Sequence, residues 1–444
     1  MIPRIDRIDL RDRDTAALNR VSLAAVLPRA TLDVAAAAEQ IRPVCEDVRQ
    51  RGAAAVREYT ARFDGVDLET TRVPPEALEA ALSALDPAVA RALEEAARRA
   101  RLVHEAQLPP AENTVTPADG LTVTARYVPV SRAGVYVPGG LVAYPSSVVM
   151  NVVPAQVAGV PSVAVASPPR ADQGGLPHPA VLAACALLGV DEVHAVGGAQ
   201  ALAMFAYGTD VCAPADVLTG PGNVYVAAAK RLLGGVVGTD GENGPTEIAI
   251  IADHTADPAF VAADLIAQAE HDPLAATLLI TSDPGLPERT DAELAKQLPG
   301  QLNRERIEEA FHGQSAYVLV RDVDAALAVS DAWAPEHLEV QTEDAGKVAT
   351  RVRNAGAIFA GPYSPVSLGD YLAGSNHVLP TGGTARHAAG LTVLPFLKLV
   401  NVIECGREGL ATAAPYIDAL GGEEQLAAHV AAVRVRVPQE GTPG

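Results

Sequence analysis

The sequence predicts an α/β protein of two Rossmann-like α/β domains, one inserted in the other, plus a helical N-terminal region and a C-terminal helical arm. Strand-like runs such as "GVYVPGG", "SVAVASPP" and "DEVHAVGG" alternate with apolar helix-like segments over residues 135–245. This alternation is typical of a parallel sheet with helical crossovers. A second series of strand-like runs, from "EIAIIAD" to "GAIFAG", follows residue 246. We therefore expect the first sheet to interrupt a larger domain.

The expected domain boundaries follow from this interruption. Residues 1–24 form an N-terminal extension, and residues 25–134 contribute helical segments rich in Ala, Arg and Glu to the main domain. That domain resumes at residues 246–390, after the inserted domain at 135–245. Residues 391–444 are expected to form the arm, in which "EEQLAAHVAAV" has the composition of a helix.

Composition excludes several kinds of partner. The formal net charge is −20, which argues against nucleic acid or an anionic membrane as a partner because both repel an acidic protein. No uncharged apolar run reaches the ~18 residues of a membrane span. The four cysteines form no CxxC pair, so neither a disulfide framework nor a thiolate zinc site is indicated. We expect a cytoplasmic protein that acts on a small molecule.

A helix that ends in "AQAEHDP" carries the first candidate site residues. Asp257 is its expected N-cap and Pro258 its first residue, and the helix must stop before Pro273. Gln268 and His271 are three residues apart, so they share one face of the helix and can point at one polar group or a metal. The alternative is that both cap the last carbonyl groups of the helix.

Glycine-rich turns follow three strands of the inserted domain: "YVPGG", "VGGAQ" and "TGPGNVYV". Such turns at the carboxyl ends of parallel strands let backbone approach a phosphate, which helix N-termini attract. None of them is a GxGxxG motif, and a tight turn without a ligand is the alternative for each. Together they favour a dinucleotide site, where Gln200 and Asn223 begin the next helices and can hydrogen-bond the cofactor.

The segment "APEHLEV" places Glu336 and His337 between a helix and a strand. Consecutive side chains of extended backbone diverge, so this carboxylate and imidazole can serve two different reacting atoms. Histidine is a natural base for an alcohol proton, and a carboxylate can activate water. A solvated pair on a loop is the alternative.

Two further pairs of polar residues lie near the C-terminus. Asp370 and His377 fall in a segment rich in Gly, Ser, Asn and Pro, and we expect both on loops, although Asp370 could instead cap a helix that starts at Tyr371. Glu424 and His429 are five residues apart on the expected C-terminal helix. They can share a ligand only if it lies between their two faces, and a solvent-facing helix is the alternative.

With these segments in order, residues 25 to 435 resemble the histidinol dehydrogenase family. The resemblance rests on "YVPGG", "GPGNVYVAAAK", "GPTEIAIIAD", "AQAEHDP", "APEHLEV", "NAGAIF", "LGDYLAGSNHVLPT" and "LAAHVAAV". It implies an NAD-dependent, zinc-dependent enzyme of histidine biosynthesis. Such an enzyme oxidises L-histidinol to L-histidinaldehyde and then to L-histidine, and it consumes two NAD⁺.

The resemblance also implies roles for individual residues. His337 is the base for the hydroxyl proton, and Glu336 activates the water that attacks the aldehyde. The ligands implied for one Zn²⁺ per subunit are Gln268, His271, Asp370 and His429, which also approach the substrate. The other substrate contacts implied are Thr246, His337, His377 and Glu424. The NAD contacts implied are Tyr136, Gln200 and Asn223.

The family resemblance further implies a homodimer with shared active sites, in which the arm that carries His429 reaches the partner subunit. Many family members have serine where Thr246 stands, and this difference keeps the hydroxyl and adds a methyl group. Two alternatives remain. One is a paralogous NAD-dependent dehydrogenase that oxidises another small polar alcohol, such as a sulfonated diol, and the other is a metal-binding or scaffold protein without catalytic activity.

Overall fold

The computed structural model describes the chain at residues 5–30, 33–139, 143–242 and 244–437. The chain divides into two compact units. The first unit comprises Met1–Gln107 and Ser131–Phe396, and the second comprises Leu108–Val130 and Leu397–Gly444. Each unit is described below by itself.

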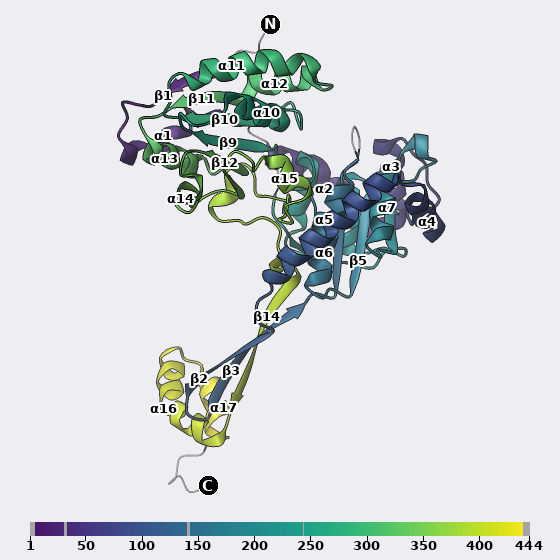
Figure 1. Cartoon of the computed structure of the whole chain (residues 1–444). Helices are drawn as coiled ribbons and strands as arrows, with labels where there is room; N and C mark the ends of the chain where they lie inside the picture. The colour runs from purple at the N-terminus through teal and green to yellow at the C-terminus, as the bar shows by residue number, and fades with distance from the viewer. Residues whose placement is uncertain (1–4, 31–32, 140–142, 243, 438–444) are drawn as a thin grey trace. The chain divides into compact units, whose positions relative to one another are not determined.

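A six-stranded parallel sheet forms one half of the first unit. Its order is β1-β11-β10-β9-β12-β13. The strands are β1 (Asp6–Asp9), β9 (Glu247–Ala252), β10 (Ala276–Thr281), β11 (Ser315–Leu319), β12 (His337–Gln341) and β13 (Ala357–Ala360). Helices α10, α11 and α12 pack on one face, and α1, α13 and α14 pack on the other (Figure 1). Their bounds are α1 (Arg20–Leu23), α10 (Pro258–Ala269), α11 (Leu286–Gln297), α12 (Arg304–Gln314), α13 (Val323–Trp333) and α14 (Ala345–Ala349).

A five-stranded parallel sheet, of order β6-β5-β4-β7-β8, forms the other half of this unit. Its strands are β4 (Arg132–Tyr136), β5 (Ser162–Ser167), β6 (Glu192–Ala195), β7 (Val217–Thr219) and β8 (Gly238–Thr239). One face carries α2 (Val34–Arg51), α3 (Ala53–Asp64), α8 (Gly198–Tyr207) and α9 (Val224–Leu233). The other carries α4 (Pro75–Ala84), α5 (Pro87–Ala106), α6 (Pro145–Val157) and α7 (Pro179–Leu187).

The four N-terminal helices α2 to α5 thus pack on the five-stranded sheet, whereas the sequence analysis grouped residues 25–134 with the six-stranded one. Amphipathic periodicity identifies the apolar face of a helix but not the sheet that this face will cover. The N-terminal extension also contributes β1, which pairs with β11. The expected boundaries between domains remain a prediction.

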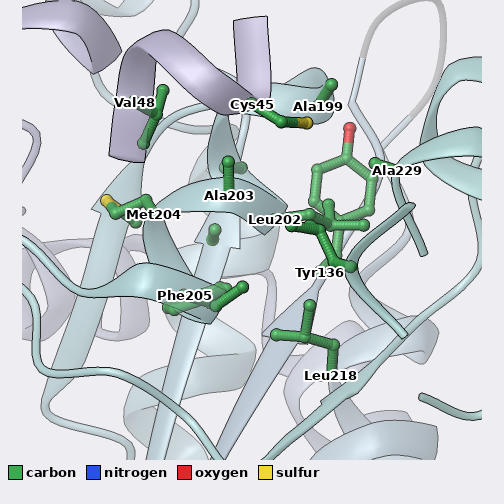
Figure 2. Close-up of a cluster of buried hydrophobic side chains, with 14 of the residues drawn as sticks. Cys45, Val48, Tyr136, Ala199, Leu202, Ala203, Met204, Phe205, Leu218 and Ala229 are labelled. Carbon is green, nitrogen blue, oxygen red and sulfur yellow. The ribbon is translucent and has the colours of Figure 1, made fainter. Parts of the chain in front are cut away.

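The core beneath α8 shows why small residues recur in this half of the protein. Figure 2 shows Met204 and Phe205 of α8 in one buried cluster with Leu218 and Tyr136 of the sheet. Gly134 on β4 faces the same side chains. A Cβ atom there would lie 2.8 Å from Phe205 Cγ and 2.9 Å from Leu218 Cδ2, so the missing side chain makes room for the phenyl ring.

The second unit contains an antiparallel sheet of order β14-β3-β2 and two helices. Its elements are β2 (Glu112–Ala118), β3 (Leu121–Pro129), β14 (Leu397–Cys405), α16 (Arg407–Glu423) and α17 (Ala427–Arg434). The arm expected to be helical therefore also contains a long strand. Glu424 and His429 were expected on one helix, and this expectation is wrong. Gln425 has a φ of 58°, and that left-handed residue breaks the helix between them.

The remaining elements are short. Helix α15 covers Val366–Tyr371, and 3₁₀ helices cover Thr15–Ala17, Ala171–Gln173, Leu298–Gly300, Thr384–Arg386 and Leu394–Phe396. Within the part of the chain that the structure describes, no helix is both long enough and apolar enough to cross a bilayer.

Replacing Gly134 by alanine should destabilise the first unit. The new methyl group would overlap Phe205 and Leu218, and overpacking of this kind costs about 1–3 kcal/mol. Gly235→Ala is the matched control, because a Cβ atom there meets no atom within 4 Å. Thermal unfolding of both variants measures the difference, and equal melting temperatures would contradict the tight packing at Gly134.

Candidate active site

Strands β9 and β12 are neighbours in the six-stranded sheet, and their pairing sets His337 opposite Ile248. This register brings the backbone of Glu247 against the first residues of β12. The Glu247 amide donates a hydrogen bond to Glu336 Oε2 at 2.9 Å, and His337 Nδ1 lies 3.1 Å from the Glu247 carbonyl oxygen. The backbone of one residue thus orients both the carboxyl group and the imidazole.

This acid–base pair lies at the amino-terminal edge of its sheet. Strands β9 and β12 begin at Glu247 and His337. Glu336 falls between α13 and β12, as the sequence predicted, whereas His337 is already the first residue of β12. Ala334, which ends α13, has a φ of 55°, and this left-handed turn directs the chain into the strand.

His337 has the geometry of a base. Its side chain is buried, and its pKa is lowered chiefly because burial disfavours the charged imidazolium, although the charge of Asp370 opposes that shift. Nδ1 faces the carbonyl oxygen of Glu247, so Nδ1 carries the proton and Nε2 keeps its lone pair. Among the described residues, Nε2 is buried without a hydrogen-bond partner.

Glu336 is protonated more readily than an ordinary glutamate. Burial raises its pKa to about 8, and the hydrogen bonds from Thr246 and from the Glu247 amide oppose that rise. The Glu247 side chain lies nearby, where burial raises its pKa to about 7, the Arg29 guanidinium opposes that rise and the charge of Glu336 adds to it. Arg29 Nε forms an ion pair with Glu247 Oε1 at 2.8 Å.

A chain of hydrogen bonds connects Glu336 to α10, the helix that carries Gln268. Thr246 Oγ1 donates to Glu336 Oε2 at 2.6 Å and accepts from Gln268 Nε2. Gln268 Oε1 is buried and has no hydrogen-bond partner among the described residues. His271 Nδ1 lies 2.9 Å from the Ala267 carbonyl oxygen, which leaves the lone pair on Nε2. The helix has Asp257 as its N-cap, as predicted, but it ends at Ala269, so His271 lies beyond the helix and not on a helical face shared with Gln268.

The structure corrects the expectation that Asp370 lies on a loop. Asp370 belongs to α15 (Val366–Tyr371), a helix too short to produce a readable periodic pattern. His377 does follow on irregular backbone, with Nδ1 at 3.1 Å from the Asp370 carbonyl oxygen and Nε2 at 3.3 Å from Ser147 Oγ. The Asp370 charge raises the pKa of both Glu336 and His337, so the three groups share one site.

Glu424 and His429 belong to the second unit, where both are exposed. The first unit therefore brings together seven of the predicted site residues, and Glu424 and His429 are not among these seven. These seven are Thr246, Gln268, His271, Glu336, His337, Asp370 and His377.

The three residues expected to contact NAD line one cavity of about 990 Å³ beside the five-stranded sheet. Gln200 is buried at the start of α8, and its Nε2 has no hydrogen-bond partner among the described residues. Asn223 is the N-cap of α9, as predicted. The Tyr136 hydroxyl accepts a hydrogen bond from the Gly198 amide at 3.2 Å. Gly140, in the expected "YVPGG" turn, lies outside the described residues.

The same cavity has features that suit a phosphate. Helix α8 begins after Gly197 without a side-chain cap. Its first amide, that of Gly198, donates to Tyr136, so the amides that follow it are the ones that can bind an anion. The turn after β7 approaches the backbone of Tyr136 closely and requires a glycine at position 220. Gly220 has a φ of 123°, and a Cβ atom added there would lie 1.9 Å from the Tyr136 carbonyl oxygen. Any larger residue would push the two turns apart.

Sequence analysis missed two acidic residues of these sites. Asp64 lines the cavity beside the five-stranded sheet, and burial raises its pKa to about 6. It is the last residue of the amphipathic helix α3, so its sequence context gives no signal. Glu247 was regarded only as part of a strand. Its charge at the start of an otherwise apolar run was the available signal, because buried carboxyl groups are rare.

One cluster of potential metal ligands lies elsewhere. Single atoms of Glu192, His194 and Cys212 lie within 4.8 Å of one another. Arg132 donates to both Glu192 oxygens at 2.6 and 2.9 Å and approaches Cys212 Sγ at 3.8 Å. Burial raises the pKa of Glu192, but its bonds to His194 and Arg132 outweigh this and lower it to about 2. Arg132 therefore already neutralises the charge of the Glu192 carboxylate. None of the predicted zinc ligands belongs to this cluster.

The fold and the site define an α/β enzyme with a large cavity beside one sheet and a buried acid–base pair beside the other. A family model for histidinol dehydrogenase matches residues 27–437. The histidinol dehydrogenases of Thermobifida fusca and Mycobacterium tuberculosis are 61% and 56% identical to this chain, with 98% of each chain covered. A crystal structure of histidinol dehydrogenase from Elizabethkingia anophelis matches with a TM-score of 0.91 at 30% identity, covering 99% of this chain and 100% of that one. The chain belongs to the histidinol dehydrogenase family and is an oxidoreductase.

The hydroxyl of Thr246 should control the protonation of Glu336. Thr246→Val removes a hydrogen bond that lowers the pKa of Glu336, so the pKa should rise further and the activity should require a more alkaline pH. Thr246→Ser keeps the hydroxyl and should keep the wild-type profile. The pH dependence of the rate for both variants tests this, and a valine variant with an unshifted profile would contradict the role of the hydroxyl.

Proposed function

We propose that this enzyme oxidises L-histidinol to L-histidinaldehyde and then to L-histidine, the last steps of histidine biosynthesis, with NAD⁺ and zinc. The observation that carries the proposal is the pair of buried atoms without hydrogen-bond partners among the described residues, His337 Nε2 and Gln268 Oε1. Buried polar atoms are nearly always paired. Two unpaired atoms in one site therefore suit a proton acceptor and a ligand atom that await a bound molecule.

The proposed zinc ligands are Gln268, His271, Asp370 and His429. Two nitrogens and two oxygens suit Zn²⁺. His271 fits this role because its Nδ1 is oriented by the Ala267 carbonyl, as is usual for a metal-binding imidazole. Gln268 and His271 also lie at the C-terminal end of α10, where the helix dipole favours a cation. A bound zinc ion would supply a Lewis acid that orients the substrate through the imidazole and the amine of the substrate.

The proposed NAD⁺ site is the cavity lined by Tyr136, Gln200 and Asn223. The uncapped start of α8 supplies amides for the pyrophosphate, and Gln200 Nε2 supplies a further donor. Bound NAD⁺ supplies the hydride acceptor in both oxidations. The substrate is then held by the other residues implied by the family, which include Thr246, His377 and Glu424.

We infer that the acid–base work is divided between two residues. Neutral His337 accepts the hydroxyl proton of L-histidinol on Nε2 while the alcohol carbon is oxidised to the aldehyde. Glu336 then acts as a base toward the water that adds to L-histidinaldehyde, and the resulting hydrate is oxidised to the acid. Glu336 must be ionised for this step. Because its pKa is about 8, the second oxidation should speed up as the pH rises toward 9.

We also propose a cytoplasmic homodimer in which the second unit of one subunit completes the site of the other. The second unit exposes large apolar side chains on its strands and on α16. Ile403, Tyr416 and Leu420 are 69%, 72% and 67% exposed, and a cluster of exposed apolar residues favours a protein interface. A second copy of the chain is the partner that would bring His429 to a metal site.

Glu336→Gln should impair aldehyde oxidation more than alcohol oxidation. Loss of a general base slows a step by about 10²–10⁴-fold, and water activation is needed only in the second step. His337→Asn should slow both steps. The two rates are measured separately with L-histidinol and L-histidinaldehyde between pH 7 and 9, and equal losses for both substrates in Glu336→Gln would overturn this division.

Thermal unfolding provides the control for this experiment. The pKa of Glu336 is higher in the folded protein than its ordinary value of 4.5, so the folded state loses stability as the pH rises from about 4.5 to about 8. Glu336→Gln removes this loss. The melting temperature of the variant at pH 8 should therefore be no lower than that of wild type. A lower melting temperature would show that the variant loses activity because it unfolds.

The shared site predicts complementation between two inactive variants. His337→Ala disables the site on the first unit, whereas His429→Ala disables the arm. A mixed dimer combines both defects in one site and leaves the other site intact. Random mixing makes half of the dimers mixed, so activity should return to about a quarter of wild type. No recovery after unfolding and refolding together, although mixed dimers form, would show that His429 serves its own subunit.

A further inference from the structure

A pair of carboxyl groups, one buried and one partly buried, joins β12 to α10. Glu339 on β12 is 1% exposed, and its side chain hydrogen-bonds the carboxyl group of Asp264 on α10. Gln341 Nε2 bridges the pair, at 2.9 Å from Glu339 Oε2 and 3.1 Å from Asp264 Oδ2. None of these three residues belongs to the catalytic or ligand set described above.

Glu339 also reaches the second ligand-bearing helix. Its Oε1 accepts a hydrogen bond from the amide of Val366, the first residue of α15, at 3.1 Å. Asp264 precedes Gln268 by four residues on α10, and Val366 precedes Asp370 by four residues on α15. Each contact is therefore made about one helical turn before a proposed ligand. Helices α10 and α15 contact each other, and Glu339 joins them.

The pair must share a proton to form this link. Two carboxylates in hydrogen-bond contact in a buried site cannot both be ionised. Burial raises the pKa of Glu339 well above its ordinary value, and the Asp264 charge adds to that rise. Protonated Glu339 can then donate to Asp264 with one oxygen while the other accepts from the Val366 amide. A single side chain thereby fixes the separation of two helices.

We propose that Glu339, through its hydrogen bonds to Asp264 and the Val366 amide, is a positioning residue. It sets the distance between α10, which carries Gln268 and ends just before His271, and α15, which carries Asp370. This inference rests on the proposed zinc site. Residues that orient metal ligands in this way typically change metal affinity by about 10–100-fold when they are replaced.

The variants Glu339→Leu and Glu339→Gln test the proposal. Leucine cannot bond either helix, so zinc should bind at least about tenfold more weakly, and the amide of Val366 should exchange its hydrogen faster. Glutamine can accept from Val366 through its carbonyl and donate to Asp264 through its amide, while Gln341, whose Oε1 has no hydrogen-bond partner among the described residues, turns that oxygen toward the new amide group. It should therefore keep both the zinc affinity and the protection of that amide near their wild-type values.

Thr277→Val is the matched control for lost stability. It removes a buried hydrogen bond of 2.8 Å between Thr277 and Ser315 in the same sheet, on strands that carry no proposed ligand. It should lower the melting temperature and leave zinc affinity unchanged. Where Glu339→Leu fails to fold, Asp264→Ala takes its place, because Asp264 is only partly buried and this variant cuts the link to α10.

Zinc dissociation constants are measured by competition with a chromophoric chelator on the full-length protein. Weaker binding in Glu339→Leu or Asp264→Ala, with glutamine and Thr277→Val unaffected, supports the positioning role. A folded Glu339→Leu that binds zinc as tightly as wild type overturns it and leaves the zinc site standing. A wild-type protein that binds no zinc overturns the zinc site, and the positioning role with it.

Discussion

The parallel pairing of β9 with β12 is the constraint on which the site depends. It sets His337 opposite Ile248, and only this register lets the Glu247 amide bind Glu336 while the Glu247 carbonyl accepts from His337. A slip of one residue would turn every side chain of β12 to the opposite face of the sheet. Backbone pairing therefore sets both the tautomer of the His337 imidazole and the orientation of the Glu336 carboxyl group. Few side-chain substitutions can disturb this pairing.

The cost of this arrangement is a concentration of buried acids along the same two strands. Glu247, Glu336 and Glu339 are each at most 7% exposed, and burial raises the pKa of all three. A different neighbouring group offsets the burial of each carboxyl group. Arg29 pairs with Glu247, Thr246 donates to Glu336, and Glu339 shares a proton with Asp264. Buried groups of this kind are expected at functional sites, where they hold protonation states that water would not allow.

Sequence reasoning succeeded where a local rule decides the structure. The N-cap at Asp257, the N-cap at Asn223 and the strand that begins beside Glu336 all follow from neighbouring residues. It failed where long-range packing decides. The six-residue α15 around Asp370 and the helix break at Gln425 leave no periodic signal. The backbone role of Glu247 depends on a strand 90 residues away in the chain, which no local pattern can reveal.

The two sheets of the first unit offer opposite edges to ligands. On the five-stranded sheet, the glycine-rich turns follow the carboxyl ends of β4, β6 and β7, and α8 begins beside the cavity without a side-chain cap. Such an edge favours an anion. On the six-stranded sheet, the acid–base pair lies at the amino ends of β9 and β12, where α10 ends. The C-terminal end of a helix favours a cation. In a parallel sheet with helical crossovers, helices begin at one edge of the sheet and end at the other. The edge where helices begin suits a phosphate, and the edge where they end suits a metal.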